Sequence, residues 1–166
     1  SAAEREKEKK KPKTIKETKE TKLNSASFQA NKGRLPWPVS KGEITKGFGK
    51  QAHPVHAGVY TYNNGVDITT VRGSTVRAVY SGTISSVVNI PGAGKAIIVS
   101  HGNYRTVYSN IQEAYVQKGD KIIAKQEIGS LLISPDGSVS QVHFEIMIIT
   151  PEGQIKNLNP SYWLYK

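Results

Sequence analysis

Residues 138–155 read SVSQVHFEIMIITPEGQI, and this stretch decides the fold class. Apolar and polar residues alternate along most of it, which is typical of a β-strand that buries one face. A proline and a glycine at 151–153 then supply a turn, and a short apolar segment follows. The stretch predicts a long strand, a turn and a short returning strand. Gln141, His143 and Glu145 should share one face of the long strand.

The segments before this stretch show the same β pattern. Alternating runs at 74–90, 94–101 and 103–111 are separated by glycine-containing turns, one of them at Gly102. Turn signals recur about every 8–12 residues, and no helix-length pattern with a 3.6-residue period lies between them. We therefore predict a small, antiparallel, all-β domain over residues 31–166. Three large side chains near its end should seal the sheet: Tyr162, Trp163 and Leu164.

Residues 1–30 differ in composition from the rest of the chain. They hold nine Lys/Arg and five Asp/Glu, and Ile15 and Leu23 are the sizeable apolar residues of the first 24. Such a segment buries too little apolar surface to offset its ordering entropy. Glu and Lys three and four positions apart also permit a helix, although Pro12 would interrupt it. We predict a charged tail, or the end of an upstream coiled coil, over residues 1–30.

Composition excludes several kinds of protein. The chain of 166 residues has no cysteine, which rules out disulfides, Cys-ligated zinc and a thiol nucleophile. No apolar run approaches the roughly 18 residues of a membrane span. The net charge is +10, but the Lys and Arg are scattered rather than banded with aromatic residues, so we expect no nucleic-acid partner. No signal peptide is visible, and we expect any export signal to lie upstream.

Several polar residues have the spacing of a metal site. The stretch NNGVDITT places Asn63 and Asp67 four apart across a glycine, and YSNI places Asn110 at the expected end of a strand. QVHFEI supplies Gln141 and His143 two positions apart, so both side chains should point to the same face. A strand that holds zinc often carries two histidines at this spacing. Here glutamine occupies the first of the two positions.

Together these residues resemble the lysostaphin/LytM-type zinc endopeptidase domain. The resemblance covers about residues 33–166 and fixes the expected fold as a small lysostaphin/LytM-like β domain with a central groove. Further segments match in the same order: RLPWPVSKGEITKGFG, the dipeptide His53–Pro54, RGSTVRAVYSGTI, IIVSHGNYRTVYSNI, VQKGDKIIAKQEIG and NPSYWL.

The resemblance also implies which functional residues are missing. The family's first zinc-ligand motif, His-x-Gly-x-Asp, keeps its aspartate here as Asp67 but has Asn63 for the histidine. Its Tyr-x-His-Leu motif has Asn110 for a catalytic histidine. Its His-x-His motif has Gln141 for the other catalytic histidine and keeps the zinc ligand as His143. Two of three ligands, Asp67 and His143, are therefore vestigial, and both catalytic histidines are absent.

The chemistry of these replacements points away from catalysis. A catalytic zinc uses three protein ligands and a water, and a neutral carboxamide is a poor substitute for imidazole. Asn110 and Gln141 do not exchange protons near pH 7, so they cannot supply the roughly 10²–10⁴-fold effect of general acid–base catalysis. His56 is the one histidine with a place in the sequence from which it could replace the missing ligand. We expect neither bound metal nor another cofactor, and for His143 a hydrogen bond with Asp67 or water.

Degenerate domains of this kind resemble the EnvC- and NlpD-type cell-division proteins. That resemblance implies a non-catalytic activator of a peptidoglycan N-acetylmuramoyl-L-alanine amidase in the periplasm or cell envelope. The groove would bind the regulatory element of the amidase through six residues: Asn63, Asp67, Tyr104, Asn110, Gln141 and His143. For Tyr104, and for Tyr108 on the same face, packing within the sheet is an equal alternative. Two other functions stay open: a zinc endopeptidase with a rebuilt site, and a scaffold module that binds peptidoglycan.

Overall fold

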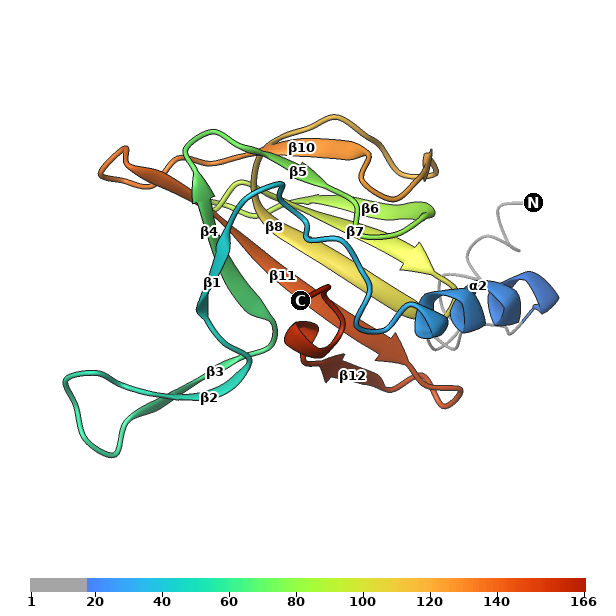
Figure 1. Cartoon of the computed structure of the whole chain (residues 1–166), viewed down its shortest axis with the longest axis horizontal. Coiled ribbons are helices and arrows are strands. Elements are labelled where there is room, and N and C mark those ends of the chain that lie inside the picture. The colour runs from blue at the N-terminus through green and yellow to red at the C-terminus, as the bar shows by residue number, and fades with distance from the viewer. Residues whose placement is uncertain (1–17) are drawn as a thin grey trace.

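The structure is a computed structural model, and it describes residues 18–166. Within these residues a helix is followed by twelve strands and a final 3-10 turn (Figure 1). The elements are α2 (Lys19–Ala30), β1 (Glu43–Lys46), β2 (Gly49–Ala52), β3 (Tyr60–Asn63), β4 (Val66–Val71), β5 (Thr75–Arg77), β6 (Gly82–Asn89), β7 (Lys95–His101), β8 (Tyr104–Ala114), β9 (Lys121–Ile122), β10 (Glu127–Leu131), β11 (Val139–Ile149), β12 (Ile155–Leu158) and η1 (Pro160–Tyr162).

Ten strands form one antiparallel sheet. Its main path runs β1-β4-β11-β8-β7-β6-β9, while β12 pairs with β11, and β10 pairs with both β5 and β8. The predicted long strand, turn and return are confirmed as β11 and β12, and the hairpin around Gly102 is confirmed as β7 and β8. The antiparallel, all-β character of the domain is therefore confirmed, with helix confined to α2 and η1 in the described residues.

The alternation in β11 determines which side chains enter the core. Ser140, Val142, Phe144 and Ile146 are buried, and the residues between them face the opposite side of the sheet. Tyr108 of β8 packs against Phe144, with ring centroids 5.3 Å apart. A shift of one residue would exchange the two faces of the strand, so burial of this apolar set fixes the register.

The structure describes residues 18–30 of the segment that was predicted to be a charged tail or the end of a coiled coil. Residues 19–30 form α2, which Thr18 caps by accepting a hydrogen bond from the Thr21 amide at 3.0 Å. Phe28 of this helix is fully buried among aromatic side chains of the domain. The segment for which a charged tail and the end of a coiled coil were both open therefore contributes a core residue. Its hydrophobic content is low, and a single well-placed aromatic side chain anchors it.

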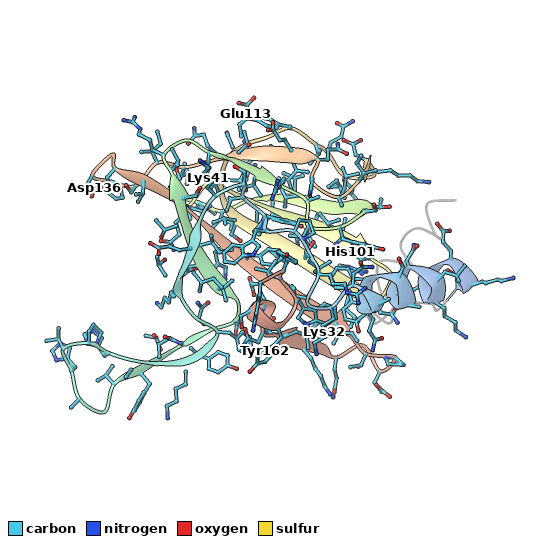
Figure 2. The ribbon with its side chains drawn as sticks, in the orientation of Figure 1. Lys32, Lys41, His101, Glu113, Asp136 and Tyr162 are labelled. Carbon is cyan, nitrogen blue, oxygen red and sulfur yellow. The ribbon has the colours of Figure 1, made fainter. Side chains whose placement is uncertain are left out.

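The chain ends on the same aromatic cluster. Trp163 stacks on Phe28 with ring centroids 5.1 Å apart, and Leu164 is buried beside it, as predicted. The prediction was wrong for Tyr162, whose side chain is 62% exposed. Tyr162 belongs to the 3-10 turn η1, whose geometry buries Pro160 and directs the tyrosine outward. Figure 2 labels Tyr162, which lies at the surface of the molecule.

Strands β2 and β3 form a separate two-stranded sheet. Figure 1 shows this hairpin extending away from the main sheet, on the side of β1 and β4. Figure 2 places His101 beside α2 and Asp136 at the opposite end of the molecule, in the loop before β11. These two ends differ in character: one is an aromatic core around the helix, and the other carries the candidate site.

Candidate functional site

Three neighbouring strands bring the central residues of the site into one row. In the register of β4, β11 and β8, Asp67 lies opposite His143, and His143 lies opposite Ser109. Directly opposed side chains on one face of antiparallel strands are about 4.5–5.5 Å apart at their Cβ atoms. The row therefore needs no loop to assemble it. Gly65 allows the strands to approach, because a Cβ there would lie 2.1 Å from the carbonyl oxygen of Phe144.

His143 lies between two carboxylates. Its Nδ1 is 2.6 Å from Oδ1 of Asp67, and its Nε2 is 3.4 Å from Oε2 of Glu145. The hydrogen bond to Asp67, followed by that to Glu145, raises the pKa of His143 to about 9, although partial burial opposes the shift. At neutral pH the imidazole is therefore a cation that donates from Nδ1 to Asp67 and forms an ion pair with Glu145 through Nε2. The contact with Asp67 agrees with the hydrogen bond expected from the sequence.

Asn63, at the position of the missing zinc ligand, has a structural role. Its Nδ2 donates to the carbonyl of Gly47 at 3.0 Å, and its Oδ1 accepts from the amide of Gly65 at 3.2 Å. The side chain is buried and does not line the pocket described below. Asn63 connects the start of the β2–β3 hairpin to the turn before Asp67.

Asn110 and Gln141 lie together at the site. Nδ2 of Asn110 donates to the main-chain carbonyl of Gln141 at 2.7 Å, which ties β8 to β11. We expected Asn110 at the end of a strand, but β8 continues to Ala114, and Asn110 has a φ of 72° at an irregularity in its pairing. Asparagine tolerates this left-handed conformation better than most residues. The strand thus bends next to the groove without ending there.

A pocket of about 410 Å³ opens over this row. Four of the six predicted site residues line it: Asp67, Asn110, Gln141 and His143. The structure adds six that we did not predict, namely Ser109, Ile90, Ala93, Ser134, Pro135 and Val139. Most of these additions come from the turn after β6 and the loop before β11. The turn sequences PGAG and SPDG were visible, but strand pairing alone brings them to the same pocket.

Tyr104 is placed elsewhere. It is buried against Phe28 and Trp163, with ring centroids 4.9 and 5.3 Å away, and it does not line the pocket. Its strand partner on β11 is Ile148, five residues beyond His143. Tyr108 is also buried, and its hydroxyl accepts a hydrogen bond from the Val79 amide at 3.0 Å. Packing within the sheet is therefore the arrangement that both tyrosines adopt.

These residues do not fit a catalytic zinc. Asp67 and His143 meet at Nδ1 of the ring, whereas Glu145 lies at the opposite nitrogen and is not placed to be a third ligand beside them. Asn63 is turned toward the main chain of Gly47 and offers no third ligand. Within residues 18–166, no group of three His, Cys, Asp or Glu side chains has a geometry suited to a metal ion.

The other histidines lie outside the site. His56 is at the tip of the β2–β3 hairpin, where its ring lies 4.7 Å from that of His53 and its amide donates to Nδ1 of His53. It is therefore not placed to complete a metal site with Asp67. His101 is buried, its Nδ1 donates to the carbonyl of Ser81 at 2.7 Å, and burial lowers its pKa to about 4.

Comparison with known proteins identifies the family. Residues 61–160 match peptidase family M23, a region that contains the whole row and every residue of the pocket. The chain belongs to this family. The LytM-type resemblance seen in the sequence is confirmed, and with it the lysostaphin-like fold.

Relatives in the family include enzymes that act on peptidoglycan. The chain is 31% identical over 118 residues to peptidoglycan DD-endopeptidase ShyB of Vibrio cholerae, an alignment that covers 68% of this chain and 27% of ShyB. Across the curated relatives that it matches, the chain spans between 21% and 36% of their length.

Solved structures show the same fold. The M23 catalytic domain of EnpA from Enterococcus faecalis superposes with a TM-score of 0.60 at 26% identity, covering 76% of this chain and 94% of that one. SpoIIQ in the SpoIIQ–SpoIIIAH pore-forming complex superposes with a TM-score of 0.59 at 25% identity, covering 80% and 91%. In residues 18–166, the helices are too short or too polar to cross a bilayer.

Proposed function

We propose that this M23 domain is a non-catalytic activator of a peptidoglycan N-acetylmuramoyl-L-alanine amidase during cell division and cell separation. The groove over Asp67, Asn110, Gln141 and His143 binds the regulatory element of the amidase. In this proposal the domain uses no metal, cleaves nothing itself and works in the periplasm or elsewhere in the cell envelope.

The arrangement of His143 carries the proposal. Its two nitrogens are engaged by Asp67 and Glu145, while Asn63 is held to the main chain of Gly47. The positions that the LytM-type resemblance assigns to zinc ligands are thus used for an internal ion pair and a structural hydrogen bond. Asn110 and Gln141 have no proton to exchange near neutral pH, so they cannot perform general acid–base catalysis.

The groove is present although one zinc ligand and both catalytic histidines of the LytM-type pattern are replaced here. Its polar floor is flanked by the apolar side chains of Ile90, Ala93 and Val139, and Ile90 and Val139 are exposed. A floor of hydrogen-bonding groups with apolar walls suits an amphipathic helix or an extended segment. The SpoIIQ relative was solved in a complex with another protein, which supports a protein partner for this chain.

Activation then follows from differential binding. A domain that binds the open amidase more tightly than the closed amidase shifts the population toward the open form. A change from 1:99 to 99:1 needs about 5.5 kcal/mol of difference in binding free energy. The groove therefore needs to recognise an element that is accessible only when the amidase is open.

The test measures release of dye from labelled peptidoglycan by a purified amidase of the same organism, with and without the domain. We expect faster release when the domain is added. Gln141→Arg should abolish the increase because it places a long cation in the groove. Gln112→Arg is the matched control on an exposed part of β8 and should activate normally. An amidase that is equally active alone would overturn the proposal.

The kinship with ShyB favours a second candidate, a zinc-dependent peptidoglycan endopeptidase with a rebuilt site. It predicts dye release by the domain alone in the same assay. A peptidoglycan-binding scaffold would instead pellet with purified cell wall and leave the amidase rate unchanged. The three functions are thus separated by one set of samples.

A further inference from the structure

The β2–β3 hairpin has the surface of a binding element. We define the β2–β3 arm as residues 46–63, which comprise the two strands, their connecting loop and the approach to β2. In the described part of the chain, β2 and β3 pair only with each other. A two-stranded hairpin without further packing is at best marginally stable in water. The outer edge of each strand has no strand partner among residues 18–166, and an edge of this kind can bind a further strand.

Large apolar side chains are concentrated on this arm. Val55 is 79% exposed, Tyr62 64%, Tyr60 53% and Val59 47%. A single exposed apolar side chain is ordinary, but several on one projecting element mark an interaction surface. Tyrosine is also among the residues enriched at binding hot spots.

The arm is also basic. Between Glu43 and Asp67 the sequence has no acidic residue, while Lys46 and Lys50 are both exposed. The ammonium of Lys50 lies 4.0 Å from the centroid of the Tyr60 ring. One face of that ring is therefore covered by a cation, and the edge of the arm combines positive charge with apolar surface.

We propose that the β2–β3 arm is a second docking surface, which binds an acidic and apolar segment of a protein partner as an added strand. The proposal rests on the proposed function in one respect, that the partner is a protein. Charge complementarity requires carboxylates on the bound segment, and the valines require apolar side chains. A glycan gains little from branched aliphatic side chains, and the Lys50 ammonium occupies one face of Tyr60, so the arm suits a polypeptide better than peptidoglycan.

The test selects a phage-displayed library of random 12-residue peptides on the immobilised domain. We expect enrichment of peptides that combine Asp or Glu with aromatic or aliphatic residues. Their affinity should fall about tenfold or more for Lys50→Glu, and likewise for the double variant Tyr60→Ser with Tyr62→Ser, as for loss of a hot spot. Matched surface controls are Lys118→Glu and the pair Tyr115→Ser with Tyr162→Ser, which should bind normally.

Several outcomes would overturn the proposal. One is the absence of any enriched peptide, and another is enrichment of peptides without acidic residues. Equal binding to the wild type and to both arm variants would also contradict it. Purified peptidoglycan is pelleted with the same proteins, and loss of pelleting in the arm variants with unchanged peptide binding would assign the arm to the cell wall. The selection uses no amidase, so its result is independent of the activation assay.

Discussion

At the scale of single residues, an ion pair occupies the place where the family resemblance predicts two zinc ligands. Asp67 and His143 are the two ligands that the family resemblance identified, and they bind each other at 2.6 Å. A cationic imidazole between Asp67 and Glu145 neutralises negative charge in the floor of the groove. The floor keeps its shape through these contacts and through the hydrogen bond from Asn110 to the carbonyl of Gln141.

Phe28 gives the first prediction at this scale. Its ring is fully buried and contacts His101, Tyr104 and Trp163, with centroids 4.7, 4.9 and 5.1 Å away. Phe28→Ala should lower the free energy of unfolding by about 3–5 kcal/mol, as for other buried aromatic residues. Leu23→Ala, on the exposed side of the same helix, is the control and should change it little. Urea unfolding of both variants measures the difference, and equal stabilities would mean that α2 is not part of the folded unit.

The second prediction concerns the buried His101. Burial lowers its pKa to about 4, whereas an unfolded histidine has a pKa near 6.5. Between these values the unfolded chain binds a proton that the folded chain does not, so stability falls as pH falls, by at most about 1.4 kcal/mol per unit. The contribution of neutral His101 to the free energy of unfolding is therefore complete above pH 6.5 and decreases as the pH falls toward 4.

Comparison with His101→Gln isolates this effect from the titration of other groups. We expect the difference in unfolding free energy between wild type and variant to shrink as pH falls from 6.5 to 4. Chemical denaturation at half-unit intervals measures it. A difference that is constant with pH would show that His101 titrates alike in both states.

A residue's position could be predicted where a local sequence pattern determines it. It could not be predicted where contacts with residues distant in the sequence determine it. Asp67, Asn110, Gln141 and His143 were predicted from the motif positions of the resembled family, and strand alternation accounts for the shared face of Gln141 and His143. The burial of Tyr104 depends on Phe28 and Trp163, which arrive from opposite ends of the chain. The turned side chain of Asn63 depends on the carbonyl of Gly47, which no local pattern predicts.

At the scale of elements, α2 packs against the β7–β8 turn. The hydroxyl of Ser25 accepts a hydrogen bond from the amide of Asn103 at 2.8 Å. A Cβ on Gly102 would lie 2.5 Å from the main-chain nitrogen of Ser25 and 2.6 Å from the carbonyl oxygen of Thr21. A glycine is therefore required at position 102, because its φ is 68° and because the backbones of the helix and the turn approach each other closely there.

Gly102→Ala tests this contact, and Gly92→Ala provides a matched control. Gly92 has a similar φ of 74°, but a Cβ there has nothing within 4 Å. Alanine at a positive φ costs about 1 kcal/mol or more at either site. We expect Gly102→Ala to cost clearly more, because α2 must also move away. Thermal unfolding measures both, and equal losses of stability would contradict the close packing of helix and turn.

The strands were more predictable than the helix. Alternation over β11 and the glycine turn between β7 and β8 are local signals, so these elements follow from the sequence. Helix α2 has few apolar residues, and tertiary packing of Phe28 stabilises it. Its stability depends on an aromatic cluster to which the sheet contributes His101 and Tyr104.

At the scale of the whole molecule, the two ends of the sheet have separate roles. One end holds α2 and the aromatic cluster, and the other holds the groove, with the loop of Asp136 at its extremity (Figure 2). The β2–β3 arm projects beyond the sheet on a third side (Figure 1).

We expect this site not to bind zinc stoichiometrically. Binding would have to displace His143 from its contacts with Asp67 and Glu145, and Asn63 would not complete the coordination. Calorimetric titration of the metal-stripped domain with zinc should show no stoichiometric site. The variant His143→Ala should give the same weak signal as the wild type. One zinc per chain, lost in this variant, would contradict the prediction.

In the proposed function, the groove binds a protein partner and does not hydrolyse peptidoglycan. The most direct measurement incubates the wild-type domain with purified cross-linked muropeptide dimers and zinc, and follows the monomers by chromatography. Without a general acid or base, we expect no monomer above the level of the His143→Ala variant and of a sample without protein. Monomer formed by the wild type, and lost in that variant, would show that the domain is a peptidase and contradict the account.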